Sequence, residues 1–317
     1  RDRFILAAGH GSMLLYSVAY LCGYADFDID QLKNFRQLGK KTAGHPENFL
    51  SDVIETTTGP LGQGIANSVG FAIAEESLRA RFGRNIIDHH TFVIAGDGCL
   101  MEGVSQEAIS LAGHLRLHKL IVFWDNNNIT IDGTVDLTDS TDQKTRFEAS
   151  GWEVIEIDGH DPEEIDSAIS AAKNSEKPTM IACKTHIAIG TAAQDTSKGH
   201  GALTDPELIK DAREVYQWSH KPFDIPKSIK EQWEQAGLEG DKAFQRWRSH
   251  LESLSNSKRK EFERIFSGDA PKKLTSAIRK FKKESSAASP TIATRKSSEL
   301  TLNAINSFMQ ETIGGSA

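Results

Sequence analysis

The sequence has little of what membrane proteins, disulfide-rich domains and nucleic-acid-binding proteins need. Its 317 residues include no apolar run near the ~18 residues of a membrane span, so we expect no transmembrane segment. Its three cysteines, Cys22, Cys99 and Cys183, are far apart and form no C-x-x-C pair, which is typical of a reduced cytoplasmic protein. The net charge of −7 argues against nucleic-acid binding as the main function.

Two common nucleotide-binding motifs are also missing. No G-x-x-x-x-G-K-[ST] sequence is present, which argues against a P-loop NTPase. Gly62-Gln63-Gly64 does not continue into G-x-G-x-x-G, and no strand is predicted directly before it. A dinucleotide-binding dehydrogenase is therefore a poor second interpretation.

The sequence shows no signal-peptide pattern and does not begin with methionine. It begins Arg1-Asp2-Arg3 and ends Ile313-Gly314-Gly315-Ser316-Ala317, which reads as the start of a turn. We therefore expect it to be part of a longer protein.

Strands and helices alternate in the middle of the chain. This alternation predicts βαβ units and an α/β fold with a parallel sheet flanked by helices. The predicted strands are residues 91–95, 120–124, 152–157 and 179–183, and the helices between them are 101–115, 146–150 and 163–173.

Helices and loops are predicted on both sides of this region. Residues 4–7 are a short apolar run, residues 185–202 are a long polar loop, and residues 284–290 are a linker. The helix over 63–81 carries small residues, Gly64, Ala66, Gly70 and Ala74, which permit close packing. Other helical segments are predicted at residues 13–21, 28–38 (starting at Asp28 or Asp30), 205–218, 226–283 and 295–309.

Two polar turns follow neighbouring predicted strands. Gly96-Asp97-Gly98 ends one strand and Asn126-Asn127 ends the next, with 27 residues between Gly98 and Asn126. That gap holds one helix and one strand, so both turns lie at the carboxyl edge of the sheet, where α/β proteins bind ligands. Either motif alone would be an ordinary turn. Together they offer carboxylate and amide oxygens to Mg²⁺, and glycines and a helix N-terminus to a phosphate.

This spacing resembles that of thiamin-diphosphate enzymes, and the whole chain resembles transketolase, most weakly at residues 226–285. The resemblance implies the thiamin-diphosphate-binding fold with a helical C-terminal linker region. Its parts would be a diphosphate and Mg-binding domain at 1–204, a helical linker region at 205–289, and the start of a pyrimidine-binding domain at 290–317. The motifs that carry it are Gly9-His10-Gly11-Ser12, Gly44-His45-Pro46-Glu47, Thr57-Thr58-Gly59-Pro60-Leu61-Gly62-Gln63-Gly64, Gly96-Asp97-Gly98-Cys99-Leu100-Met101-Glu102-Gly103 and His200-Gly201-Ala202.

The resemblance also implies a cofactor site. Thiamin diphosphate would be bound with Mg²⁺, for which Ca²⁺ or Mn²⁺ would be substitutes. The metal ligands would be Asp97, Asn127 and the carbonyl of Ile129. The cofactor-binding residues would be His10, Gly59, Pro60, Leu61, Gly98, Asn127 and His200.

The same resemblance implies catalytic and substrate-binding residues. His45 and His200 would face the substrate and the reaction centre, and Arg295 would bind the sugar phosphate. Glu102 would connect, across a dimer interface, to the glutamate that activates the cofactor. A carboxylate in a first helical turn is also favoured by the helix dipole, and Arg295 could be a solvated helix-start residue. Asn128 stands where the family usually has glycine, and the histidines at 89, 90, 114, 118 and 160 are expected on the surface.

The implied function is transfer of a two-carbon ketol unit from a ketose phosphate to an aldose phosphate, in the pentose phosphate pathway. The protein would be a cytoplasmic homodimer with its active site at the subunit interface, and would bind neither nucleic acid nor membranes. By this resemblance the pyrimidine-binding half would follow Ala317, so this chain is expected to be inactive alone. The alternatives are the N-terminal subunit of a split transketolase, a formaldehyde-using (dihydroxyacetone synthase-like) transketolase, and a non-catalytic cofactor-binding module.

Overall fold

The computed structural model describes residues 2–201 and 204–315, and it divides into two compact units. The first unit comprises Arg1–Glu76 and Asp88–Gln245, and the second comprises Ser77–Ile87 and Arg246–Ala317. Across the described residues, no helix combines the length and apolarity that crossing a membrane requires. The predicted domain boundaries at residues 204 and 289 separate expected functions, whereas the two units are defined by their compactness. The predicted boundaries therefore stay a prediction.

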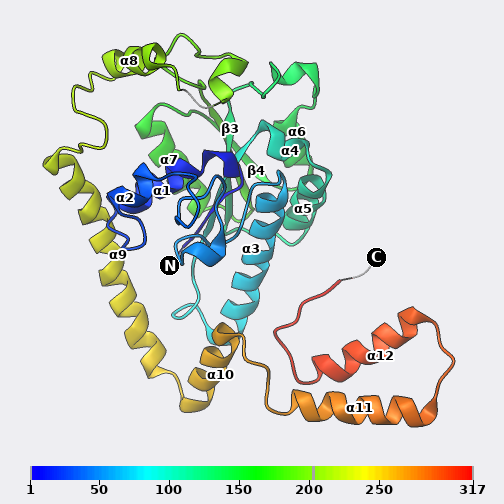
Figure 1. Ribbon diagram of the computed structural model, residues 1–317. Helices are drawn as coiled ribbons and strands as arrows, with labels where there is room; N and C mark the ends of the chain where they lie inside the picture. Colours follow the sequence, from blue (N-terminus) through cyan, green and yellow to red (C-terminus); the bar gives the residue numbers. More distant parts are fainter. Residues whose placement is uncertain (1, 202–203, 316–317) are drawn as a thin grey trace. The chain divides into compact units, whose positions relative to one another are not determined.

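A five-stranded parallel sheet forms the centre of the first unit (Figure 1). The strand order is β1-β2-β3-β5-β4, and every neighbouring pair is parallel. The predicted α/β class and the four predicted strands are confirmed. The apolar run at 4–7 contributes a fifth strand that was not predicted. The strands are β1 (Arg3–Leu6), β2 (Thr91–Gly96), β3 (Leu120–Asn126), β4 (Glu153–Asp158) and β5 (Thr179–Lys184).

Helices cover both faces of this sheet (Figure 1). Because side chains alternate along a strand, Val93 and Val122 face one layer, and Ile94 and Ile121 face the other. The first layer contains α3 (Gln63–Phe82) and α5 (Gly103–His114). The second contains α1 (Ser12–Leu21) and α7 (Pro162–Lys173). This coverage explains why the central strands read as continuous apolar runs.

The helix predicted at 101–115 is wrong in its start and in its continuity. Helix α4 (Asp97–Met101) begins directly after β2, with Asp97 as its first residue. Glu102 is extended (φ −73°, ψ 134°), and α5 starts at the next residue. The strand therefore runs straight into a helix, and the turn expected at 96–98 is a helical first turn.

The helix predicted at 28–38 is too long. Asp28 caps α2 (Ile29–Lys33), because its side chain accepts a hydrogen bond from the backbone N–H of Gln31 at 2.8 Å. Arg36 then takes a left-handed conformation (φ 61°), and its N–H donates to the carbonyl of Thr42 at 2.8 Å. This contact outside the helix ends it early.

The small-residue face predicted on α3 is only partly used for packing. A Cβ at Gly64 would lie 2.5 Å from the Cα of Ala7, so α3 and the end of β1 approach closely there. A Cβ at Gly70 would meet nothing within 4 Å. The expectation of close packing is therefore confirmed at Gly64 and wrong at Gly70.

The rest of the chain is mainly helical. The predicted linker at 284–290 is too long, because α11 continues through Ala288 before Ser289 turns left-handed (φ 41°). In the second unit, Phe82, Ile86 and Ile87 pack with Phe262 in a core of their own. The remaining helices are α6 (Gln143–Ala149), α8 (Pro206–Val215), α9 (Lys227–Ser253), α10 (Asn256–Ser267), α11 (Leu274–Ala288) and α12 (Thr294–Asn306), with 3-10 turns at Gly9–Gly11, Asn48–Leu50, Val135–Leu137 and Ser197–His200.

Candidate active site

The carboxyl ends of four neighbouring strands bring the predicted motifs to one edge of the sheet. Gly96 at the end of β2 pairs with Asp125 of β3, and Asp125 pairs with Cys183 of β5. The segments that follow these strands start with Asp97, Asn127 and Thr185. The segment after β1 carries Gly9-His10-Gly11 and joins them, because β1 lies beside β2.

Asp97 is a buried carboxylate that lacks part of its hydrogen bonding. Its side chain is among the buried polar groups, and its Oδ1 accepts a hydrogen bond from the indole N–H of Trp124 at 3.0 Å. Its Oδ2 is buried and has no hydrogen-bond partner within residues 2–201 and 204–315. Burial, aided by the nearby Asp125 carboxylate, raises the pKa of Asp97 to about 6. Such a group is suited to a cation, which would satisfy the free oxygen and its charge.

The turn after β3 presents oxygen atoms beside Asp97. The Oδ1 of Asn127 accepts from the backbone N–H of Ile129 at 2.9 Å, and an amide oxygen has a second lone pair for a ligand. Asn128 is left-handed (φ 61°). Asparagine tolerates this conformation better than most residues, so it is compatible with a position where the family usually has glycine. A cavity of about 260 Å³ lies here, with Asp97, Trp124 and Asn128 in its wall.

This donor set fits a hard cation bound together with a phosphate. The described residues contain no group of three or more His, Cys, Asp or Glu side chains arranged for a metal. Asp97 would supply the charge, and the other ligands would be amide, carbonyl and phosphate oxygens, as Mg²⁺ prefers. Gly98 leaves its backbone uncovered by a side chain. A Cβ there would lie 2.9 Å from Cδ1 of Leu61 and would displace the Leu61 side chain.

Three histidines from separate loops meet at the same edge. The rings of His10 and His200 stack with their centroids 5.0 Å apart. Burial lowers the pKa of His10, and His200 and His45 lower it further because like charges repel. The Nδ1 of His200 is buried and has no partner among the described residues. The site therefore favours a neutral His10 imidazole, which can accept or donate a proton. Ala202, the last residue of the His200 motif, lies outside the described residues.

Residues 59–61 lie close to His45 at one end and to Gly98 at the other. Gly59 is left-handed (φ 146°), and a Cβ there would lie 3.0 Å from Cγ of His45, so glycine is required. Leu61 packs against the main core, and Pro60 is exposed. Glu102 is exposed in the break between α4 and α5, and its Cβ would lie 2.7 Å from a Cβ at Gly62.

Arg295 is not part of this cluster of described contacts. It lies in the second compact unit, in the first turn of α12 (Thr294–Asn306), and is exposed. Its predicted role in binding the sugar phosphate stays a prediction.

Sequence reasoning missed Asp125. Its carboxylate accepts hydrogen bonds from the Thr185 hydroxyl and from the Asn127 side-chain amide, the latter at 3.3 Å. It also raises the pKa of Asp97 and opposes the lowering at His10. The available signal was its place as the first polar residue after the apolar run of β3.

The surface location expected for His89 and His90 is wrong. Both are half-buried beside the N-terminal ends of the strands. Burial, followed by the positive charge of Arg3, lowers the pKa of His89 to about 4. These histidines lie at the opposite edge of the sheet from Asp97 and take no part in the site.

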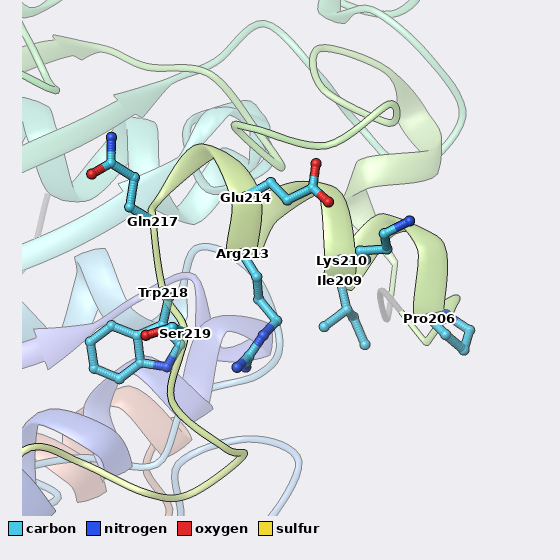
Figure 2. Close-up of a pocket in the computed structure, with 8 residues that line it drawn as sticks. All are labelled: Pro206, Ile209, Lys210, Arg213, Glu214, Gln217, Trp218 and Ser219. Carbon is cyan, nitrogen blue, oxygen red and sulfur yellow. The ribbon is translucent and has the colours of Figure 1, made fainter.

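A separate cavity of about 550 Å³ lies along α8 and the turn after it (Figure 2). Its wall includes Ile209, Arg213 and Trp218, and all its lining residues fall between Pro206 and Ser219. None of the predicted cofactor or metal residues borders it. We therefore place the candidate site at the strand ends and not in this cavity.

Comparison with known proteins gives the class of this protein. Residues 1–271 match the family described as transketolase, thiamine diphosphate binding domain. The chain belongs to this family.

Named relatives and solved structures give the same result. The chain is 54% identical to the transketolase of Rhodobacter capsulatus, covering 100% of this chain and 47% of that protein. It is 47% identical to transketolase 2 of Escherichia coli, covering 100% of this chain and 49% of that protein. It superposes on transketolase from Leishmania mexicana with a TM-score of 0.87 at 38% identity, covering 97% of this chain and 46% of that chain. The chain thus spans about half the length of the curated relatives it matches.

Proposed function

We propose that this chain is the N-terminal, cofactor-binding half of a transketolase, which moves a two-carbon ketol unit from a ketose phosphate to an aldose phosphate. The observation that carries the proposal is the buried Oδ2 of Asp97, which has no hydrogen-bond partner among the described residues and lies at the sheet edge where the adjacent strand leads to Asn127. Membership of the transketolase family supports the same assignment. The fit of the donor set to a hard cation supports Mg²⁺ with thiamin diphosphate, and Ca²⁺ or Mn²⁺ as substitutes.

The metal would be held by Asp97, Asn127 and the carbonyl of Ile129. Gly98 would let the backbone approach the diphosphate, and His10 and His200 would donate hydrogen bonds to it. Gly59, Pro60 and Leu61 would line the space for the rings. Thiamin diphosphate, when bound, supplies the nucleophilic carbon and the electron sink that carbon–carbon bond cleavage needs.

The protein's own residues would orient the substrate and move protons. His45 would contact the substrate hydroxyls, and Arg295 would bind the sugar phosphate. His200, whose Nδ1 has no partner among the described residues, would exchange a proton with the reacting oxygen. Glu102 is exposed and is free to meet a second subunit, which supports a homodimer with the site at the interface. The unpaired cysteines support a reducing compartment such as the cytoplasm.

The test is ketol transfer by the full-length enzyme. Purified protein is incubated with Mg²⁺, thiamin diphosphate, a ketose-phosphate donor and ribose phosphate, and the products are followed by a coupled assay. Turnover that Asp97→Asn abolishes and Asp136→Asn retains would support the proposal and exclude a contaminating host enzyme. Tight cofactor binding without transfer to any aldose phosphate would overturn it in favour of a binding module. Transfer to formaldehyde alone would assign a different acceptor.

A further inference from the structure

Two hydroxyl groups of α1 hold the loop that carries His45. Ser12 and Tyr16 lie one turn apart on this helix, and both are fully buried at 0% exposure. The Ser12 hydroxyl lies 3.0 Å from the carbonyl oxygen of Gly44 and 3.2 Å from that of Ala43. The Tyr16 hydroxyl lies 3.0 Å from the carbonyl oxygen of Ala43 and 3.3 Å from that of His45. The three carbonyls are consecutive.

These contacts replace the hydrogen bonds that regular structure would provide. Residues 43–45 belong to neither a helix nor a strand, so their carbonyls need other donors. Each hydroxyl has one proton, and two protons therefore serve three acceptors. Burial raises the pKa of Tyr16 to about 12, so its hydroxyl keeps its proton and remains a donor near neutral pH.

The loop is also held on both sides of these carbonyls. The Thr42 hydroxyl donates to the carbonyl of Gln31 at 2.7 Å, and the Pro46 carbonyl accepts from the backbone N–H of Thr58 at 3.1 Å. Between these points the His45 ring lies against Gly59. The backbone of residues 43–45 therefore fixes where the exposed His45 imidazole stands, and α1 fixes that backbone.

We propose that Tyr16, together with Ser12, is a positioning residue that sets the His45 imidazole where it meets the substrate hydroxyls. The inference rests on the proposed function, in which His45 contacts the donor. It assigns to a buried face of α1 a part in substrate recognition. Neither hydroxyl touches the substrate itself.

The ring and the hydroxyl of Tyr16 have separable roles. The ring stacks on Phe27 at 5.2 Å within an apolar cluster, and phenylalanine would fill the same space. Tyr16→Phe therefore removes the donor and keeps the packing. Tyr20→Phe is the matched control, because it removes a hydroxyl from the same helix one turn further on.

In the full-length enzyme, Tyr16→Phe should lower kcat/KM for the ketose phosphate by about tenfold, the effect of about one lost hydrogen bond. The Kd for thiamin diphosphate should stay within about twofold, and Tyr20→Phe should change neither value. Ser12→Ala should act in the same direction and stands in for Tyr16→Phe if that variant does not fold. Wild-type kcat/KM in a folded Tyr16→Phe or Ser12→Ala variant would overturn the inference.

A double-mutant cycle tests whether the effect passes through His45. In a His45→Ala background, Tyr16→Phe should cost less than about twofold, because the group it positions is gone. A full tenfold loss in that background would show a general structural effect and overturn the inference.

Amide hydrogen exchange separates this inference from the proposed function. Exchange at residues 43–45 should be faster in Tyr16→Phe than in Tyr20→Phe, whether or not the wild-type enzyme transfers ketol units. If the wild-type enzyme is inactive but exchange still differs between the two variants, the proposed function is wrong and the role of Tyr16 in holding residues 43–45 stands. Equal exchange in both variants would overturn that role.

Discussion

Asp97 would carry the protein's charge at the proposed cation site in one side chain. It is the one carboxylate among the proposed metal ligands, so its charge has no substitute there. Asp97→Asn keeps the shape and removes the charge. We expect it to weaken thiamin-diphosphate binding in Mg²⁺ by about 100-fold or more.

Calorimetric titration with Mg²⁺ and with EDTA measures this loss. Asp136→Asn is the control, because this exposed carboxylate borders the same cavity. Unchanged affinity in Asp97→Asn, or an equal loss in EDTA, would contradict the metal assignment.

The same carboxylate should make the metal-free fold less stable as the pH rises. The pKa of Asp97 is raised from 3.8 to about 6, so the folded state holds the extra proton between these values. The free energy of unfolding therefore falls as the pH rises from about 4 to 6 and stays lower above that range. The penalty reaches up to about 3 kcal/mol at ~1.4 kcal/mol per pH unit.

Urea unfolding in EDTA at pH 5 and pH 8 checks this expectation. Relative to wild type, Asp97→Asn should gain more stability at pH 8 than at pH 5, since asparagine does not ionise. Added Mg²⁺ and cofactor should make the wild type more stable than Asp97→Asn at pH 8, because they stabilise only the wild type. A mutant advantage that does not depend on pH would contradict the raised pKa.

Sequence reasoning placed Asp97 and Asn127 at the same edge of the sheet, as the strand register has them, and missed their neighbour Asp125. Asp97 and Asn127 follow adjacent parallel strands, and the spacing alone places them together. The part played by Asp125 depends on the Thr185 hydroxyl, 60 residues away, and on a shared low-dielectric environment. Such contacts between side chains are absent from any local pattern.

At the scale of elements, helix α5 packs so closely at Gly113 that this position has no room for a side chain. A Cβ at Gly113 of α5 would lie 1.7 Å from the carbonyl oxygen of Ser150, at the end of α6. Gly113→Ala must move the two backbones apart, which should destabilise the fold by about 2–3 kcal/mol. Gly70→Ala on α3 should stabilise it by about 0.5–1 kcal/mol, because a Cβ there meets nothing within 4 Å.

Thermal and urea unfolding of the two variants provide the comparison. Both changes replace a helical glycine by alanine, so helix propensity is the same in each and only the surroundings differ. Equal effects of the two substitutions would show that the approach of α5 to Ser150 is looser than described.

The predictability of the elements follows their burial. The strands β2, β3 and β5 are covered on both faces and read as apolar runs, so their patterns were sufficient. The edge strand β1 has four residues, of which two are buried, and this is too short a signal. The end of α2 depends on the contact of Arg36 with Thr42, which helix propensity does not contain.

At the scale of the whole molecule, the chain alone should show no ketol transfer. The resemblance would place the carboxylate that activates the aminopyrimidine in the second half of the enzyme, and Glu102 would correspond to the partner of that carboxylate. The apolar side chains exposed on α8, such as Ile209 and Val215, should also favour self-association. A coupled assay at saturating Mg²⁺ and cofactor, with light scattering of the same sample, measures both properties. Turnover that disappears in Asp97→Asn would show that this half is sufficient.

The strand that leads to His10 has consequences for the order of folding. Its first residue, Arg3, pairs with Thr91 across 88 positions, whereas Thr91 pairs with Leu120 across 29. Closing the longer loop costs about 1 kcal/mol more chain entropy. A denatured chain that refolds should therefore bring Asp97 and Asn127 together before it docks His10. During synthesis the order is reversed, because β2 emerges about 4–18 s after β1 and before β3, so β2 can pair with β1 first.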